Sequence, residues 1–375
     1  MTRSFALLLA AALCLPLHAQ DGASIGAGSL FSSIAGRPAT SVSAFEPRVP
    51  SIYAVAGAAV TRAPLSAGNQ FFMLATPSSG DDAPPGKGSM VGYIDDAVVG
   101  NQIRVRFDAA FDDNSPDRAE FFYAECGCDG GSAKGPKPGL ATAINFQQLY
   151  LRGEFAPVKR VSFLFELPLR WVQPQKFDPR TLASGQSGFA NQGGISDIQA
   201  GVKVAALAGE KQYLTLQIVG TFPSGDSAKG LGNHHYSIAP SLLYYRKLSS
   251  RFSVEGELGD WHPMNTDTPG FAGEVMNYGI GPSYELYHAK SIQIASVVEL
   301  VGWRIFGGEW TNAQLIGTTA GAPIDTTDDS KIVNLKAGFR TSLGNHTSFY
   351  LGFGQALSQD TWYKHIIRLE YRRTF

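Results

Sequence analysis

The amino-acid sequence predicts an all-β fold, an antiparallel transmembrane β-barrel of about 12 strands (range 10–14) with short periplasmic turns and long extracellular loops. Three observations lead to this prediction. Apolar and polar residues alternate over segments of about ten residues. The connections between these segments are short and long in turn, and aromatic residues gather at the segment ends.

The alternation is clearest in residues 161–171. Phe163, Phe165 and Leu167 share one face of an extended chain there, whereas Glu166 and Arg170 point to the other face. Successive side chains of a strand alternate across the sheet, so a period of two indicates a strand with one apolar face. A soluble β-sandwich would show the same alternation, but the segment length, the even number of segments and the unequal connections favour the barrel.

About twelve such segments follow one another, in line with the strand spacing of outer-membrane barrels. They are expected near residues 101–111, 143–155, 161–172, 195–207, 213–223, 236–248, 252–261, 274–287, 291–303, 331–343, 347–357 and 362–375. Short polar turns, such as 157–160 and 344–346, alternate with longer loops. Short turns lie in the periplasm in known outer-membrane barrels, and an even strand number brings both ends of the barrel there.

Aromatic residues are expected to form two girdles at the membrane surfaces, because a ring with a polar edge prefers the interface. The girdle beside the long loops is expected to contain Trp171, Trp261, Trp303 and Trp362, with Trp310 inside a loop. The opposite girdle is expected to contain Tyr213, Phe252, Tyr287, Tyr371 and Phe375. The alternating residues before Phe375 resemble the C-terminal insertion signal of bacterial barrels, although Arg373 occupies a position that is usually apolar.

Composition and charge exclude several classes of protein. The 375 residues include 31 Lys and Arg against 32 Asp and Glu, and the hydrophobic fraction of 44% excludes wholesale disorder. Without a basic cluster, the sequence predicts no nucleic-acid partner. Residues 1–19 read as a signal peptide, with Arg3, an apolar run and a cleavage site before Gln20. No later apolar run reaches the 18 residues of a transmembrane helix.

Residues 20–100 do not follow the strand pattern and are rich in Gly, Ala, Ser and Pro. They could form a periplasmic extension, a plug in the lumen or additional strands. Low charge and small residues favour a poorly ordered periplasmic extension. The sequence therefore divides into a signal peptide (1–19), this extension (20–100) and the barrel (101–375).

Charged residues on the polar face of the segments are expected to face the lumen, because Arg or Lys at mid-depth would cost roughly 2–4 kcal/mol against lipid. Either they form a packed, salt-bridged interior, or they line a narrow passage for solutes. The candidates for a transport lining are Arg104, Arg106, Asp108, Arg152, Glu154, Glu166, Arg170, Asp197, Lys203, Glu255, Glu257, Lys336, Arg340, Arg368 and Glu370. Glu285, Glu299 and Arg372 share the same expected face.

Sequence motifs for other chemistry are weak. Cys126 and Cys128 are expected to form a disulfide that fixes a loop, with metal binding and free thiols as the alternatives. Two thiolates are too few for a structural zinc site. His235 and Ser237 resemble the His-x-Ser pair of outer-membrane phospholipase A, but its Asn has no match. The sequence predicts no enzyme, no metal and no cofactor.

Residues 193–248 resemble a bacterial outer-membrane family. A strand opens with Gly193-Gly-Ile-Ser-Asp197 and carries Lys203; the next strand ends in Pro223-Ser-Gly-Asp226, and a Gly-rich loop follows through Gly232. This pattern is similar to the barrel transporters named for the MetA pathway of phenol degradation. The resemblance covers this part of the chain alone, and it implies passive movement of small apolar or aromatic compounds.

These observations together predict a channel or transporter for small molecules in the bacterial outer membrane. A closed barrel with a structural or surface-interaction role is the alternative, and an outer-membrane hydrolase is a third. The expected partners are outer-membrane lipid and lipopolysaccharide, the barrel-assembly machinery and small-molecule solutes.

Overall fold

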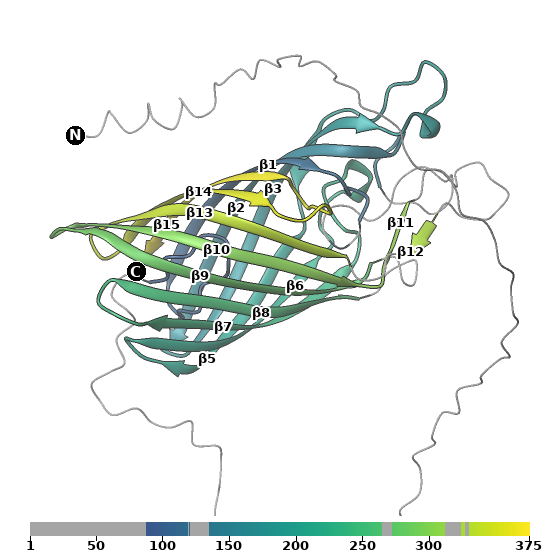
Figure 1. Ribbon diagram of the computed structural model, residues 1–375. Helices are drawn as coiled ribbons and strands as arrows, with labels where there is room; N and C mark the ends of the chain where they lie inside the picture. The colour runs from purple at the N-terminus through teal and green to yellow at the C-terminus, as the bar shows by residue number, and fades with distance from the viewer. Residues whose placement is uncertain (1–87, 119, 121–134, 265–271, 312–323, 327–329) are drawn as a thin grey trace, which may run out of the picture. The chain divides into compact units, whose positions relative to one another are not determined.

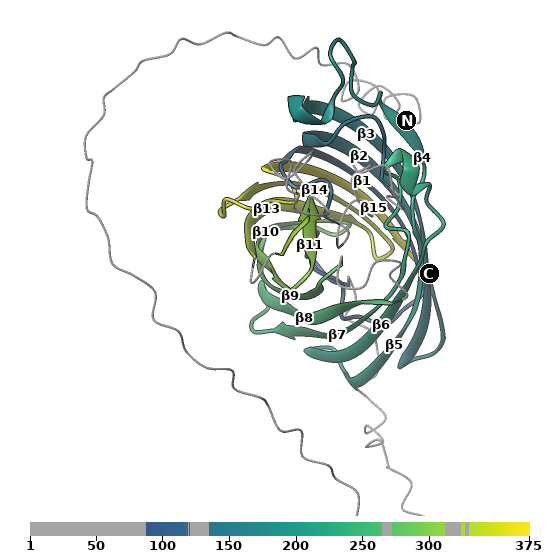
Figure 2. The ribbon, with the colours of Figure 1, turned by 90° about the vertical axis from the view of Figure 1, so that its right-hand side faces the viewer.

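The computed structural model describes residues 88–118, 120, 135–264, 272–311, 324–326 and 330–375. One antiparallel sheet dominates it, and pairing of its first strand β1 with its last strand β15 closes the sheet into a barrel (Figures 1 and 2). The short strand β4 and the longer strand β5 lie one after the other beside β3, so the closed barrel has 12 strands. The predicted fold class is confirmed.

The strands agree closely with the segments expected from the sequence. In the barrel they are β1 (Gln102–Asp113), β2 (Ala141–Val158), β3 (Val161–Phe177), β4 (Gln192–Ile195), β5 (Ile198–Ala208), β6 (Gln212–Phe222), β7 (Tyr236–Lys247), β8 (Phe252–Met264), β9 (Glu274–His288), β10 (Ile292–Phe306), β13 (Lys331–Leu343), β14 (Thr347–Ala356) and β15 (His365–Thr374). The segment expected at 195–207 is divided at Ser196 and Asp197, which separate β4 from β5.

Loops carry the remaining regular structure. Strands β11 (Glu309–Thr311) and β12 (Ile324–Thr326) form a separate two-stranded sheet within the β10–β13 connection. Two short 3₁₀ turns, η1 (Pro179–Thr181) and η2 (Ser227–Lys229), lie in two other loops. The described residues contain no helix with the length and hydropathy needed to cross a membrane.

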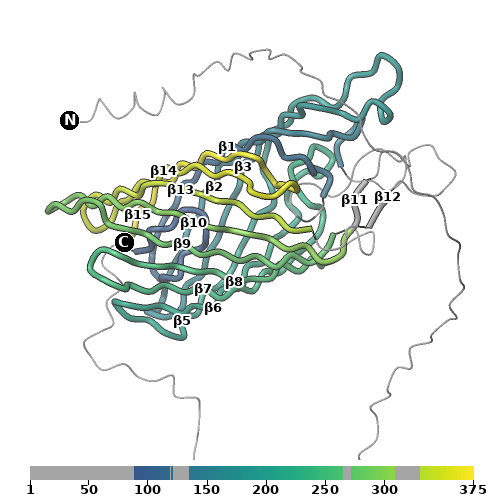
Figure 3. The backbone as a smooth tube through the Cα atoms, in the orientation of Figure 1, coloured from purple at the N-terminus to yellow at the C-terminus, as the bar shows by residue number. Residues whose placement is uncertain are grey.

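The two ends of the barrel differ as the sequence predicted. At the short-turn end, the connections that follow β2, β5, β7, β9 and β13 contain only a few residues. The start of β1 and the end of β15 lie at this end, where Gln102 pairs with Thr374. The strand ends that lead into the longer connections, after β1, β3, β6, β8 and β10, lie at the opposite, long-loop end (Figure 3).

The faces of the strands confirm the predicted register. On β3, Phe163 and Phe165 are 56% and 50% exposed, whereas Glu166 is 3% exposed. Across the inner face, Glu166 lies opposite Arg152 of β2. Exposed apolar side chains cover the outer face of the other strands as well, including Ile103, Leu242, Leu300, Phe339, Leu351 and Ile367. The wall therefore has an apolar outside and a charged inside.

The expected aromatic girdles are partly wrong. Trp171 points outward and is 41% exposed, but Trp362 is 2% exposed, and Trp261 and Trp303 pack against the same internal cluster. Tyr213, expected in the opposite girdle, is also buried inside the barrel. These rings fill the wide interior, where burial of their apolar surface stabilises them more than an interfacial position would. The Trp310 side chain lies outside the described residues.

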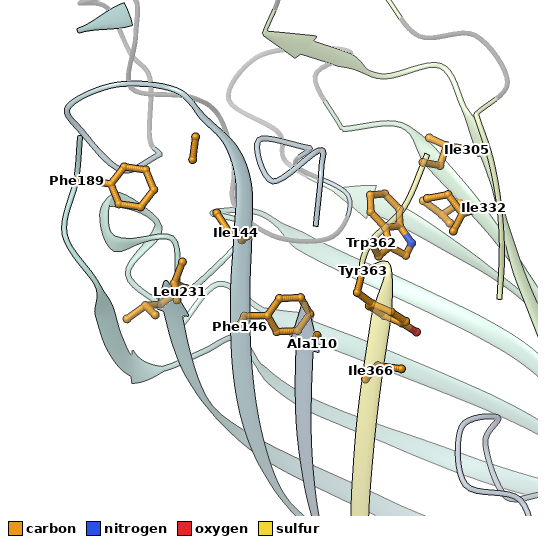
Figure 4. Close-up of a cluster of buried hydrophobic side chains, with 13 residues drawn as sticks. Ala110, Ile144, Phe146, Phe189, Leu231, Ile305, Ile332, Trp362, Tyr363 and Ile366 are labelled. Carbon is orange, nitrogen blue, oxygen red and sulfur yellow. The ribbon is translucent and has the colours of Figure 1, made fainter. Parts of the chain in front are cut away.

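An apolar cluster fills the interior at the long-loop end, and we call it the mouth cluster (Figure 4). Its members come from the strand ends nearest the long loops and from those loops themselves. They are Ala110, Ala141, Ile144, Phe146, Val172, Phe189, Leu231, Val275, Ile305, Ile332, Trp362, Tyr363 and Ile366. Apolar side chains thus replace charged ones as the inner wall approaches the mouth.

Candidate functional site

Residues 88–101, which we call the lumen segment, run inside the barrel before β1 begins (Figure 3). Near the short-turn end, Arg372 Nη1 donates a hydrogen bond to Ser89 O at 3.1 Å. The segment then rises to Tyr93, whose ring centre lies 4.2 Å from Cζ of Arg368, four residues nearer the long-loop end of β15. The segment is therefore a bend with its apex at mid-barrel.

This placement differs from the favoured expectation for residues 20–100. The sequence favoured an extension outside the barrel, whereas the described part of that stretch, residues 88–100, lies within the lumen. Residues 88–100 show no alternating pattern because they form no strand, and side chains of the wall provide hydrogen-bond partners for their backbone. Residues 20–87 lie outside the described residues.

Glu299 of β10 holds the apex of the lumen segment. Its carboxylate accepts backbone hydrogen bonds from Gly92 N at 3.1 Å and from Tyr93 N and Ile94 N at 2.9 Å each. Consecutive N–H groups on a bend form a concave site that favours an anion. Glu299 is fully buried, so these three donors replace the water that its charge would otherwise require.

Two arginines of the wall bind the carbonyl groups of the same bend. Arg340 of β13 donates to Met90 O at 2.9 Å and to Val91 O at 2.7 Å. Arg368 donates to Gly92 O at 2.7 Å. Backbone groups of a buried segment without secondary structure need partners, and the barrel supplies them from charged side chains.

The returning limb uses the opposite side of the wall. Asp95 N donates to Glu257 Oε2 of β8 at 2.8 Å. Lys203 Nζ of β5 donates to Asp96 O at 2.8 Å, and Thr215 Oγ1 of β6 donates to Ala97 O at 2.6 Å. Both limbs are thus tied to the barrel, and through different strands.

Glycines of the wall provide the space for the segment. A Cβ atom added at Gly279 would overlap the side chain of Ile94, and one at Gly281 would overlap that of Val91. Both glycines are inward positions of β9. Because their missing side chains let the segment approach the backbone of β9, the fit is steric as well as electrostatic.

The other wall charges are largely paired with one another. Glu370 lies 2.9 Å from Arg340 and 3.0 Å from Arg372. Arg368 binds Asp108 through two hydrogen bonds at 2.6 and 2.7 Å. Further pairs within the wall join Arg104 to Glu370, Arg106 to Glu166 and Lys203 to Glu154, and Arg152 pairs with Asp95 of the lumen segment. Charges of both signs therefore form a connected network around the lumen segment.

The structure places most of the sequence-derived candidates on the inner face. Contacts with the segment or within the network involve Arg104, Arg106, Asp108, Arg152, Glu154, Glu166, Lys203, Glu255, Glu257, Arg340, Arg368 and Glu370. Arg170 donates to Gln148 at 3.3 Å, nearer the mouth. Lys336 faces aromatic rings, and its Nζ lies 4.1 Å from the ring centre of Tyr93.

Asp197 has a different environment from the other candidates. It lies in the break between β4 and β5, where Gly225 N and Asn233 N donate to its carboxylate at 2.9 and 2.7 Å. A Cβ atom at Gly232 would overlap the same carboxylate. The Gly-x-x-Asp motif and the Gly-rich loop thus form one local unit, in which Asp197 fixes the β6–β7 loop.

Sequence reasoning missed Tyr93 and Tyr350, two central residues of the lumen. Their rings meet edge to face with centres 6.0 Å apart. Tyr350 occupies an inward position on β14, and Cβ atoms at Gly338 and Gly352 would overlap its ring. A large aromatic residue among inward glycines is a signal in the sequence for a ring lying flat along the wall.

The remaining expectations concern chemistry in the loops. Cys126 and Cys128 lie outside the described residues. Among the residues that are described, no group of three or more His, Cys, Asp or Glu side chains could hold a metal ion.

Comparisons with known proteins found similarity to solved structures only. No family model matches the sequence, and no curated protein matches it, so the resemblance of residues 193–248 is not confirmed. An outer membrane channel from Pseudomonas putida F1 is similar, with 16% identity and a TM-score of 0.47 over 74% of this chain and 96% of that one.

Two other solved structures are similar over almost the same part of the chain. The β-domain of the Bordetella autotransporter BrkA has 13% identity and a TM-score of 0.43 over 74% of this chain and all (100%) of that one. LpxR from Salmonella typhimurium has 9% identity and a TM-score of 0.40 over 73% and 100%. The fold is established by the strand pairing of the chain itself, and these likenesses assign no function.

Proposed function

We propose that the protein is a channel for small molecules in the bacterial outer membrane, and that the lumen segment restricts the passage. The single observation that carries the proposal is a closed barrel whose charged inner wall holds a non-strand segment by its backbone. A barrel needed only as a scaffold could fill its core with its own wall side chains. This one leaves a lumen wide enough for a separate stretch of chain.

The outer surface supports a membrane location. Every strand of the barrel carries at least one exposed, large apolar side chain, and an aqueous environment does not favour so much exposed apolar surface. A closed barrel is also one of the two structures that satisfy all backbone hydrogen bonds within lipid. Insertion by the barrel-assembly machinery and contact with lipopolysaccharide belong to the same proposal.

Polar contacts attach the lumen segment to the wall, and this supports a restriction whose width can change. The contacts at its apex are hydrogen bonds between side chains of the wall and its backbone, and water can replace each of them. Fixed charges in a narrow lumen act strongly on a passing solute, which provides selectivity. The resemblance of residues 193–248 suggests small aromatic or apolar solutes as the cargo.

A cysteine lock tests this function. An ideal Cβ at Gly279 lies 3.6 Å from Ile94 Cβ, a separation that suits a disulfide. The variant Ile94→Cys/Gly279→Cys, made with Cys126→Ser and Cys128→Ser, is measured in planar bilayers and by liposome swelling. We expect conductance when the pair is reduced, a lower conductance after oxidation, and recovery on reduction. The matched control carries Ile94→Cys alone and should not respond to oxidant.

The second candidate is a closed structural barrel, favoured by the dense ion pairing of the inner wall. It predicts no conductance and no swelling in either redox state. That result, obtained with folded protein, would reject the channel. Equal conductance of the oxidised and reduced forms would retain the channel but show that solutes pass beside a stationary segment.

A further inference from the structure

Lys336 differs from Arg340 and Arg368 because it forms no ion pair among the described residues, although Glu299 lies opposite it on β10 with its carboxylate bound to the backbone of the lumen segment. It is an inward residue of β13 and only 3% exposed. Within the described part of the chain, no Asp or Glu oxygen lies within 4.0 Å of its Nζ, whereas Arg340 and Arg368 both form ion pairs. A buried ammonium without an anion is unfavourable unless another group compensates the charge.

Aromatic rings surround this ammonium. Its Nζ lies 4.1 Å from the ring centre of Tyr93, 5.2 Å from that of Trp303 and 5.4 Å from that of Tyr363. Ring faces attract a cation, but they accept no conventional hydrogen bond from its three N–H groups. The ammonium therefore retains hydrogen-bonding capacity toward a ligand.

Two neighbouring polar groups also lack partners. Tyr93 Oη is buried and makes no hydrogen bond among the described residues. The Asn334 amide, two positions before Lys336 on the same face of β13, lies beside Tyr363 but has no well-aligned hydrogen bond. Buried polar atoms are normally paired, so an unpaired group next to an unpaired cation indicates a site for an external molecule.

The position of these groups determines what could bind. Tyr363 belongs to the mouth cluster, and Trp303 and Tyr93 pack against it. On the short-turn side of Lys336, the guanidinium groups of Arg340 and Arg368 are already engaged by Glu370 and Asp108. A ligand here would meet one free positive charge on one side and an apolar, aromatic surface on the other. A single negative charge is sufficient, and a dianion would remain partly uncompensated.

We propose that Lys336, Tyr93 and Asn334 form a binding site for the carboxylate of a small amphipathic organic acid. The Lys336 ammonium and the Tyr93 hydroxyl donate to the carboxylate, and the Asn334 amide supplies a further donor. The apolar part of the acid contacts Trp303 and Tyr363. This inference rests on the proposed function, because it identifies the class of solute that the channel carries.

Calorimetry with benzoate as the probe tests the site in the full-length protein in detergent micelles, after subtraction of the heat measured with empty micelles. We expect saturable binding to the unmodified protein. Lys336→Met should weaken binding about tenfold or more, as expected when one charge-assisted hydrogen bond is lost. Tyr93→Phe should cause a smaller loss. Benzyl alcohol, which has the ring without the charge, should bind both proteins equally.

A matched control and a stability measurement complete the experiment. Lys364→Met changes the same charge at an exposed position next to Tyr363, and it should leave benzoate binding unchanged. Lys336→Met should unfold at the same temperature as the unmodified protein or higher, because no ion pair is lost. A folded Lys336→Met variant that binds benzoate normally would overturn the site, as would an unmodified protein that does not bind benzoate.

Failure of this site and failure of the channel give different results. A protein that conducts ions but does not bind benzoate remains a channel without the proposed acid site. A protein that binds benzoate through Lys336 but neither conducts nor supports liposome swelling has the site without the channel.

Discussion

The lumen segment and the mouth cluster occupy the interior of the same barrel, but different forces hold them. Around the segment, buried charges bind backbone groups, and each contact has a defined direction and a defined partner. In the mouth cluster, side chains such as Ile305 and Trp362 contact several apolar neighbours with no directional requirement. The stability of the mid-barrel therefore depends on the presence of every polar partner, whereas the stability of the mouth cluster depends on how well apolar side chains fill its volume.

The largest effect is expected from breaking the charge network at mid-barrel. Glu370→Gln leaves Arg340 and Arg372 without their shared carboxylate, in a position with no access to water. We expect the free energy of unfolding to fall by about 3–5 kcal/mol, the usual cost of removing one partner of a buried ion pair. Urea titration of the detergent-folded protein measures this change.

The matched control for that prediction is Glu210→Gln, in the exposed turn between β5 and β6. It removes the same charge and should alter stability by less than about 0.5 kcal/mol. If the two variants have equal stability, the network does not stabilise the barrel, and the contrast with the mouth cluster disappears.

A smaller effect is expected when the fit of the lumen segment is disturbed without any change in charge. In Gly279→Ala, the added methyl group would overlap Ile94, and relief of the overlap should cost about 1–3 kcal/mol. The apex of the segment should move away from β9, so bilayer recordings should show a higher conductance. Gly153→Ala, where a Cβ meets nothing within 4 Å, should leave conductance unchanged.

The mouth cluster should tolerate a small loss of volume. Ile305→Val removes one methylene from a residue that is 1% exposed and should lower the free energy of unfolding by about 0.5–1.5 kcal/mol. Conductance should not change, because the residue makes no directional contact with the lumen segment. A loss of stability as large as that of Glu370→Gln would show that the mouth is as sensitive as the mid-barrel.

The smallest effect is expected in the long loops, outside both regions. Lys229 and Asp226 lie 3.0 Å apart, with side chains 54% and 46% exposed. Water and salt screen such a pair, so Lys229→Ala should change stability by at most about 1 kcal/mol. A larger change on urea titration would mean that the loop itself stabilises the barrel.

Sequence alone predicted the wall well, because the alternation of side chains is a local property. The inward position of Glu299 and the outward position of Phe165 follow directly from a period of two. The same rule also placed Trp303 inside, four residues from Glu299 on one strand. The prediction that Trp303 lies in an aromatic girdle was wrong because it gave more weight to the preference of Trp for the interface than to this period. The sequence already contained the information needed to place the ring inside.

The lumen segment could not be predicted in the same way. Its partners lie far along the chain: Ile94 and Glu299 are separated by 205 residues, and Gly92 and Arg368 by 276. No local pattern marks residues 88–100, because their backbone adopts no repeating structure. The site around Lys336 was hidden for a related reason, since the sequence placed its charge in the lumen but could not show which charges lack a partner.

The distance along the chain between the lumen segment and its partners has a consequence for how the barrel assembles. Glu299, Arg340 and Arg368 belong to β10, β13 and β15, so the last of them is synthesised long after residues 88–101. The segment cannot acquire all its contacts until β15 has paired with β1. Contacts of such high sequence separation form late, after the loop-closure cost has been met. Protection of the Gly92–Ile94 amides from hydrogen exchange would therefore indicate that the barrel has closed.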